Sequence, residues 1–162
     1  MCGWLLSFFH IAPISMEMEL KTFEQIARMS HPLTDKVTHH HYGEQYTRYL
    51  EKFRRMTRPV KLMEIGLGCE MDWGEGASVA IWLHKEMFVN GNVELFVFEY
   101  KRACAENHHK TSGYNYTLFV GDQSNPESLS QVRNFAPFDI IIDDGGHSMR
   151  QQQVSITYLF QF

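Results

Sequence analysis

The apolar run Phe138-Asp139-Ile140-Ile141-Ile142 is followed directly by Asp143-Asp144-Gly145-Gly146-His147. A run rich in β-branched residues is typical of a strand buried on both faces, and such strands belong to parallel sheets covered by helices. In open sheets of this kind, ligands bind beyond the carboxyl ends of the strands. The two carboxylates, the glycine pair and the imidazole fall at that position, so we expect the chemistry of the protein there.

The rest of the chain alternates between segments with helical and strand-like patterns. Strands are predicted over 60–65, 93–98, 116–120 and 138–142, and helices over 44–56, 77–88, 101–110, 124–135 and 149–160. Alternation at this rhythm predicts βαβ units with right-handed crossovers. The expected fold is therefore α/β, with a parallel sheet and helices on both of its faces.

Composition limits the size of the protein and the kind of partner it binds. With 162 residues, of which 44% are hydrophobic, the chain can form one core and is too short for two ordinary domains. A formal net charge of -4 gives no basic face for nucleic acid, so a small-molecule partner is favoured. The three cysteines are odd in number and lack metal-site spacing, which indicates a reducing, cytoplasmic compartment and argues against a disulfide framework.

The chain divides into three parts before any motif is considered. Residues 1–30 are predicted to be a leader that is poorly ordered or loosely packed. Within it, 4–14 is apolar but too short to span a bilayer as a helix. A secretory or membrane-anchored leader stays open, although no Lys or Arg precedes the apolar run and membrane binding is not favoured. Residues 31–59 are predicted to form a helical lid segment, and 60–162 a cofactor-binding domain.

Three further strand ends carry polar or glycine-rich sequence. The first strand ends in Glu64-Ile65-Gly66-Leu67-Gly68, where glycines allow a positive φ and close approach of a ligand, although a tight βα turn explains them equally well. The second strand ends at Glu99, at the separation from the glycines that a ribose-binding carboxylate shows in nucleotide folds. The third ends in Gly121-Asp122, where capping of the next helix by Asp122 competes with a role in binding.

Taken together, these strand ends resemble those of the class I S-adenosylmethionine-dependent methyltransferases, which have a Rossmann-like fold. The resemblance covers residues 34–162 and includes Ile142-Asp143-Asp144 after the fourth strand. The sequence is more closely similar to bacterial sugar O-methyltransferases that act on macrolide and related glycosides, and to their uncharacterised fungal relatives. That closer likeness depends on Thr34-Asp35-Lys36, on His40-His41-Tyr42 and on the 143–147 turn.

The resemblance implies where the cofactor S-adenosylmethionine binds. It places Gly66 and Gly68 beneath the methionine part of the cofactor and gives Glu64 the role of holding its ammonium group. It assigns the ribose hydroxyls to Glu99 and the adenine to Asp122.

The resemblance also implies how the methyl group is transferred to a hydroxyl of a sugar or other small molecule. It gives Asp144 the role of a Mg²⁺ ligand and His147 the role of the general base. Adjacent strand residues point to opposite sides, so Asp143 is expected to lie towards the cofactor or to support the loop. The acceptor could be a glycoside, and a homo-oligomer is left open.

The sequence departs from the family pattern at two places. Glu70 stands where a third glycine is usual, and the loop makes a longer excursion through 71–73 to Gly74. The family fold continues through three more strands and an acidic pair of metal ligands, so we expect a fold that is incomplete at the C-terminus. Two alternatives stay open, a non-catalytic binding module and an NAD-dependent dehydrogenase. The dehydrogenase is disfavoured because Met71 occupies the third glycine position of G-x-G-x-x-G.

Overall fold

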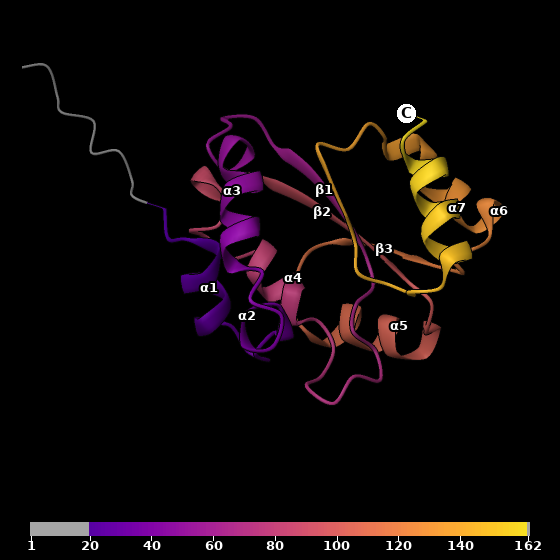
Figure 1. Cartoon of the computed structure of the whole chain (residues 1–162), viewed down its shortest axis with the longest axis horizontal. Helices are drawn as coiled ribbons and strands as arrows, with labels where there is room; N and C mark the ends of the chain where they lie inside the picture. The colour runs from indigo at the N-terminus through magenta and orange to yellow at the C-terminus, as the bar shows by residue number, and fades with distance from the viewer. Residues whose placement is uncertain (1–19, 162) are drawn as a thin grey trace, which may run out of the picture.

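A four-stranded parallel sheet lies at the centre of the computed structural model, which describes residues 20–161 (Figure 1). The strands are β1 (Val60–Ile65), β2 (Val93–Glu99), β3 (Thr117–Val120) and β4 (Ile140–Asp143), in the spatial order β3-β2-β1-β4. Ile65 pairs with Phe98 on one side and with Asp143 on the other, so the carboxyl ends of the strands meet at one edge. The predicted parallel sheet is confirmed.

Helices cover both faces of this sheet, as the sequence predicts. Their bounds are α1 (Phe23–Met29), α2 (Asp35–Thr38), α3 (Gly43–Arg54), α4 (Ala77–Trp82), α5 (Arg102–Thr111), α6 (Pro126–Leu129) and α7 (Met149–Leu159), with short 3-10 helices at Val89–Gly91 and Ser130–Phe135. In Figure 1, α1 to α4 lie on one side of the strands, and α6 and α7 on the other. Val60 and Leu62 belong to the core on the first side, and Met63 and Ile65 to the core on the second, because successive strand residues face opposite sides.

Two predicted helices are shorter in the structure than the sequence pattern indicates. The helix predicted over 77–88 ends at Trp82, and a turn closed by the Met87 amide donating to the His84 carbonyl brings Met87 and Phe88 into the same core. The helix predicted over 124–135 consists of α6 followed by a 3-10 helix. In both segments, buried apolar residues continue after the α-helix ends, so hydrophobic spacing alone overestimates its length.

The prediction of a loosely packed leader is wrong for its last residues. Phe23 and Ile26 of α1 are fully buried, and the Phe23 ring stacks on Tyr46 of α3 with 4.4 Å between the ring centroids. A capping box between Thr22 and Gln25 starts the helix. The spacing of Phe23 and Ile26 puts them on one face of α1, and that face packs against α3 and α4. Residues 1–19, including the apolar run at 4–14, lie outside the described residues.

The helices between residues 20 and 161 are all too short or too polar to cross a membrane.

Candidate functional site

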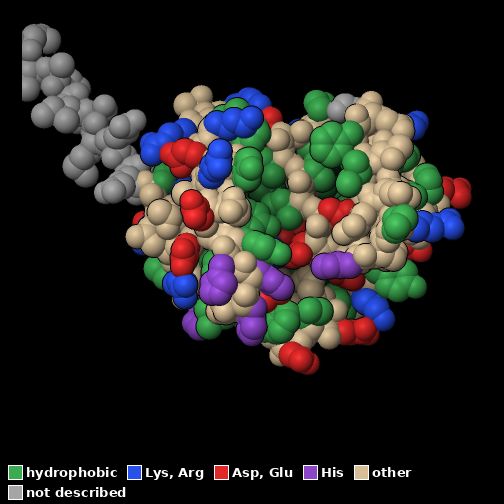
Figure 2. All heavy atoms as spheres, in the orientation of Figure 1, with side chains coloured by type: hydrophobic (Ala, Val, Ile, Leu, Met, Phe, Trp, Pro, Cys, Tyr) green, Lys and Arg blue, Asp and Glu red, His purple; other side chains and the backbone are tan. Residues whose placement is uncertain are grey.

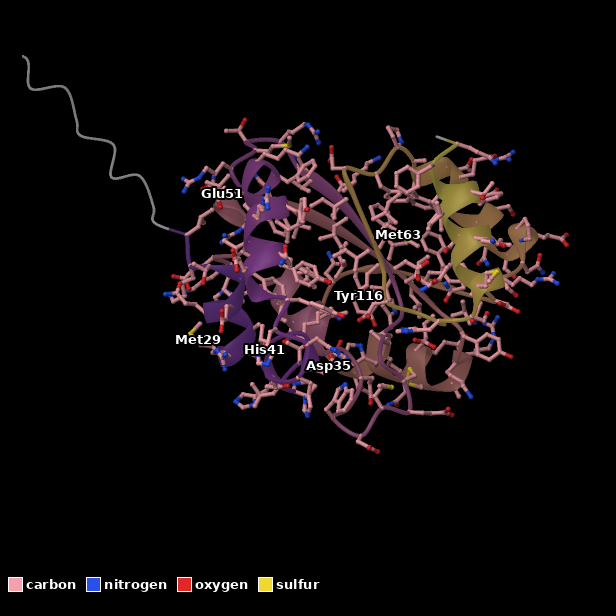
Figure 3. All side chains as sticks on the ribbon, viewed as in Figure 1. Met29, Asp35, His41, Glu51, Met63 and Tyr116 are labelled. Carbon is pink, nitrogen blue, oxygen red and sulfur yellow. A yellow bond between two sulfur atoms is a disulfide. The ribbon has the colours of Figure 1, made fainter. Side chains whose placement is uncertain are left out.

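A cavity of about 510 Å³ opens at the edge where the carboxyl ends of the strands meet. Figure 2 shows histidine side chains (purple) bordering a hollow on this face, with acidic side chains (red) inside it. The walls come from the loops after all four strands and from the segment around α2. Asp35 and His41, which are labelled in Figure 3, belong to that segment. Of the residues predicted to form the site, the cavity is lined by Gly66, Gly68, Glu99, Asp122, Asp144 and His147.

Gly66 allows the loops after β1 and β4 to touch. Its amide donates a hydrogen bond to the Phe98 carbonyl at 2.8 Å, and its φ of +98° lies in the left-handed region. A Cβ atom at this position would lie 2.4 Å from the carbonyl oxygen of Asp144, so only glycine fits. The predicted glycine loop is therefore required by backbone packing, and it places the Asp144 turn directly against the start of the loop.

Glu99 holds the two loops on either side of the predicted ribose position. Its Oε2 accepts a hydrogen bond from the Leu67 amide and its Oε1 accepts one from the Lys101 amide, each at 2.8 Å. The side chain is buried yet reaches the cavity. These two bonds fix the carboxylate in place, and each of its oxygens keeps a further lone pair for a ligand hydroxyl.

Asp122 lies at the end of β3, where the sequence left two interpretations open. Its Oδ1 accepts a hydrogen bond from the Ser124 amide at 2.7 Å, which closes a turn. The N-cap of α6 is Asn125, whose side chain accepts from the Glu127 amide. Asp122 therefore does not cap the helix, and its side chain is available at the cavity wall.

The two neighbouring acids Asp143 and Asp144 point to different surroundings, as expected. Asp143 does not line the cavity; it accepts hydrogen bonds from Gln123 Nε2, at 3.1 Å, and from the Ser155 hydroxyl. Asp143 therefore supports the turn before α7, and its predicted role as a cofactor-binding residue is not supported, because the side chain does not reach the cavity. Asp144 is half-exposed at the cavity, where its Oδ2 accepts a hydrogen bond from Lys36 Nζ.

Glu64 is fully buried and lies behind the cavity wall. Its Oε2 accepts a hydrogen bond from Trp82 Nε1 at 3.0 Å, while its Oε1 has no hydrogen-bond partner and lies 3.8 Å from Lys36 Nζ. Burial raises the pKa of Glu64 to about 7, although the Lys36 charge acts in the opposite direction. Glu64 does not line the cavity, so its contact with the ammonium group of a cofactor stays a prediction.

Lys36 is the site residue to which sequence reasoning gave no role. Its side chain is only 6% exposed, and it lies between the carboxylates of Glu64 and Asp144. Burial alone would lower the pKa of Lys36, but the two carboxylates raise it above its ordinary value. The only sequence signal was the Thr34-Asp35-Lys36 motif, which contributed to the family resemblance. The motif did not show that a segment before β1 in the sequence lies at the carboxyl end of β1.

The cysteine prediction is wrong, because Cys69 and Cys104 form a disulfide. Cys69 follows Gly68 in the loop after β1, and Cys104 is in the first turn of α5, after β2. Since β1 and β2 are parallel neighbours, the segments after them lie together, and the Cα atoms are 6.1 Å apart. A separation of 35 residues gives no local sign of this pairing. The inference of a reducing, cytoplasmic compartment therefore loses its basis.

We expect loss of this disulfide to loosen the loop after β1. A cross-link that closes a loop of this length stabilises a fold by about 3–4 kcal/mol in the chain-entropy model. Urea unfolding of the Cys69→Ser/Cys104→Ser variant should show a loss of that order, and dithiothreitol should lower wild-type stability to the same level. A Cys2→Ser control should keep the full response to dithiothreitol. Equal stability of wild type with and without dithiothreitol would contradict the prediction.

Several known proteins are similar to this chain in sequence. No protein-family model matches the chain. It is 32% identical over 124 residues to the demethylmacrocin O-methyltransferase of Streptomyces fradiae, and 31% identical over 124 residues to the mycinamicin VI 2''-O-methyltransferase of Micromonospora griseorubida. Each match covers 75% of this chain and 28% of the relative. The chain thus spans just over a quarter of the length of these relatives.

A solved structure shares the fold. The MycE methyltransferase from the mycinamycin biosynthetic pathway, in a complex with Mg and SAH, matches with a TM-score of 0.68 at 24% identity. The match covers 88% of this chain and 37% of that chain. Over the part that they share, the chain is a homologue of the macrolide sugar O-methyltransferases and has the Rossmann-like class I methyltransferase fold.

Proposed function

We propose that the protein binds S-adenosylmethionine and transfers its methyl group to a hydroxyl group of a sugar or other small molecule. The observation that carries this proposal is the convergence of the Gly66 loop, Glu99, Asp144 and His147 on one cavity. Its volume is within the range of about 300–1,000 Å³ of small-molecule sites. The homologues named as O-methyltransferases of macrolide sugars support the same chemistry.

The carboxylate oxygens at and next to the cavity fit the hydrogen-bond donors of the cofactor. The buried Oε1 of Glu64 lacks a hydrogen-bond donor, and the Glu99 carboxylate is held open to the cavity. Glu99 would accept hydrogen bonds from the ribose hydroxyls, and Asp122 would face the adenine. When bound, S-adenosylmethionine supplies a methyl carbon on a sulfonium, which a hydroxyl oxygen can attack.

His147 is proposed as the general base. It follows the Asp143-Asp144-Gly145-Gly146 turn, lines the cavity and is exposed, so an acceptor can reach its imidazole. In the reaction the imidazole takes the proton of the acceptor hydroxyl, while the hydroxyl oxygen bonds to the methyl carbon. The carbon–sulfur bond breaks with its electron pair left on sulfur, so S-adenosylhomocysteine is the co-product.

The described residues do not make up a magnesium site. Asp144 offers one carboxylate, and one of its oxygens is already bound to Lys36. Within residues 20–161, no three His, Cys, Asp or Glu side chains are grouped so that they could hold a metal ion. Mg is present in the complexes of MycE methyltransferase. Assistance by Mg²⁺ through Asp144 is therefore still a prediction, and none of the steps above depends on it.

The acceptor is proposed to be a ring-bearing molecule, such as a glycoside. The segment around α2 carries His40 and Tyr42 to the cavity, and their rings stack with 5.2 Å between centroids. Trp73, from the loop after β1, forms another aromatic part of the wall and stacks with His39. Aromatic faces suit the apolar faces of rings. One MycE methyltransferase complex contains mycinamycin VI.

Removing the proposed ribose acceptor tests the cofactor assignment. Glu99→Gln should weaken S-adenosylmethionine binding by about 10- to 100-fold in calorimetric titration, because an amide cannot replace both carboxylate oxygens. Glu70→Gln is the matched control, since Glu70 is 68% exposed and pairs with Lys101 in the same loop region. Its affinity should stay at the wild-type value. Wild-type affinity in Glu99→Gln would refute the assignment of the ribose to Glu99.

A further inference from the structure

Lys36 belongs to a sequence motif that the proposed function leaves without a role. The Thr34 side chain accepts a hydrogen bond from the Lys36 amide at 3.3 Å and so begins α2. This turn directs the Lys36 side chain inward, to the cavity and to the end of β1. A segment that precedes the sheet in the sequence thereby supplies a cation to its carboxyl edge.

Lys36, Glu64 and Asp144 form a cluster of one cation and two carboxylates. Lys36 Nζ bonds to Asp144 and lies 3.8 Å from Glu64 Oε1, which has no hydrogen-bond partner. The three side chains come from α2, β1 and the loop after β4. With both acids ionised, the cluster has a net charge of one negative unit. It therefore suits a ligand group with a net positive charge.

The strand order places this cluster at the methionine end of the cofactor. Glu99 and Asp122 are at the ends of β2 and β3, while Glu64 and Asp144 are at β1 and β4. If the ribose binds at Glu99 and the adenine at Asp122, the remaining part of the cofactor extends across Gly66 towards β4. The backbone of Asp144 packs directly against Gly66, so the cluster borders that path.

The charges of the two partners are complementary. The methionine end of S-adenosylmethionine has two cationic groups, the ammonium and the sulfonium, and one carboxylate. The cluster offers two carboxylates and one ammonium. Lys101, the other lysine at the cavity, is at the end of β2 and pairs with Glu70 at 2.9 Å, away from this end.

We propose that Lys36 binds the carboxylate of the cofactor's methionine moiety, which takes the place of Asp144 on the lysine ammonium. Asp144, released from Lys36, then faces the cationic groups of the cofactor. This inference rests on the proposed function, since it assigns one residue to one group of the proposed cofactor.

A comparison of two ligands isolates this contact without any methyl acceptor. The ligands are S-adenosylhomocysteine and its decarboxylated analogue, which keeps the ammonium and lacks the carboxylate. By calorimetry, the wild-type chain should prefer S-adenosylhomocysteine by about 10- to 100-fold. In Lys36→Met this preference should fall to about one. Lys101→Met, the matched control, should keep the wild-type preference.

The outcomes separate this inference from the proposed function. An unchanged preference in Lys36→Met, or an equal fall in Lys101→Met, would overturn the role of Lys36 and leave the cofactor assignment standing. Failure of the wild-type chain to bind either ligand would overturn both. If Lys36→Met does not fold, Lys36→Met/Glu64→Gln removes the buried pair as a whole. The preference should fall in that variant too, because both ligands keep the ammonium that Glu64 would meet, and an unchanged preference there would overturn the inference.

Discussion

Lys36→Met is expected to destabilise the protein by roughly 3–5 kcal/mol, because it leaves the Glu64 charge buried without its cation. Glu64 is fully buried, and its Oε1 has Lys36 Nζ at 3.8 Å and no hydrogen-bond donor. Once the lysine is gone, the carboxyl must either stay charged in an apolar surrounding or take up a proton, and each costs free energy.

Urea unfolding of three variants measures this effect. Lys36→Met/Glu64→Gln should recover most of the lost stability, since it removes the unpaired charge. Lys21→Met is the control, because it breaks an ion pair that is in contact with solvent. This substitution should lower the free energy of unfolding by at most about 1 kcal/mol. Lys21 pairs with Glu86, and both side chains are partly exposed. A loss in Lys36→Met no larger than that in Lys21→Met would show that the buried pair does not stabilise the fold.

His147→Ala should abolish turnover while leaving S-adenosylmethionine binding intact. Loss of a general base lowers turnover by about 10²- to 10⁴-fold. The side chain is exposed at the cavity, and no hydrogen bond with another described residue fixes it, so its removal should leave the fold unchanged. Turnover is measured as transfer of a labelled methyl group to a glycosylated macrolide, and binding by calorimetry.

His40→Ala is the matched control for this prediction. His40 also lines the cavity, but it lies in the segment around α2 and pairs with Asp35 at 3.5 Å. It should keep measurable turnover, because it has no proposed role in proton transfer. Turnover at the wild-type rate in His147→Ala would remove His147 as the base.

The sheet and most of the site could be predicted because their signals are local. The β-branched run before Asp143 and the glycines after Glu64 each report a strand and its end within a few residues. Parallel strands bring such ends to one edge, so Gly66, Glu99, Asp144 and His147 meet in one cavity. The predicted site therefore follows from short patterns combined with one topological rule.

What the sequence did not reveal depends on contacts between distant segments. Lys36 reaches Asp144 across 108 positions, and Cys69 pairs with Cys104 across 35. The burial of α1 depends on Tyr46 and Trp82, which lie in other helices. A charged or sulfur-containing residue looks the same in sequence whether it is solvated or paired. Its role became visible only when the fold placed its partner beside it.

Calorimetric titration of the purified chain with S-adenosylmethionine, with and without Mg²⁺ and with NADH as the control ligand, shows whether the cavity binds the methyl donor. We expect saturable binding of S-adenosylmethionine and none of NADH. A rise in affinity with Mg²⁺ would support assistance by the metal ion. A folded chain that does not bind S-adenosylmethionine, or that binds NADH instead, would contradict the proposed methyltransferase site.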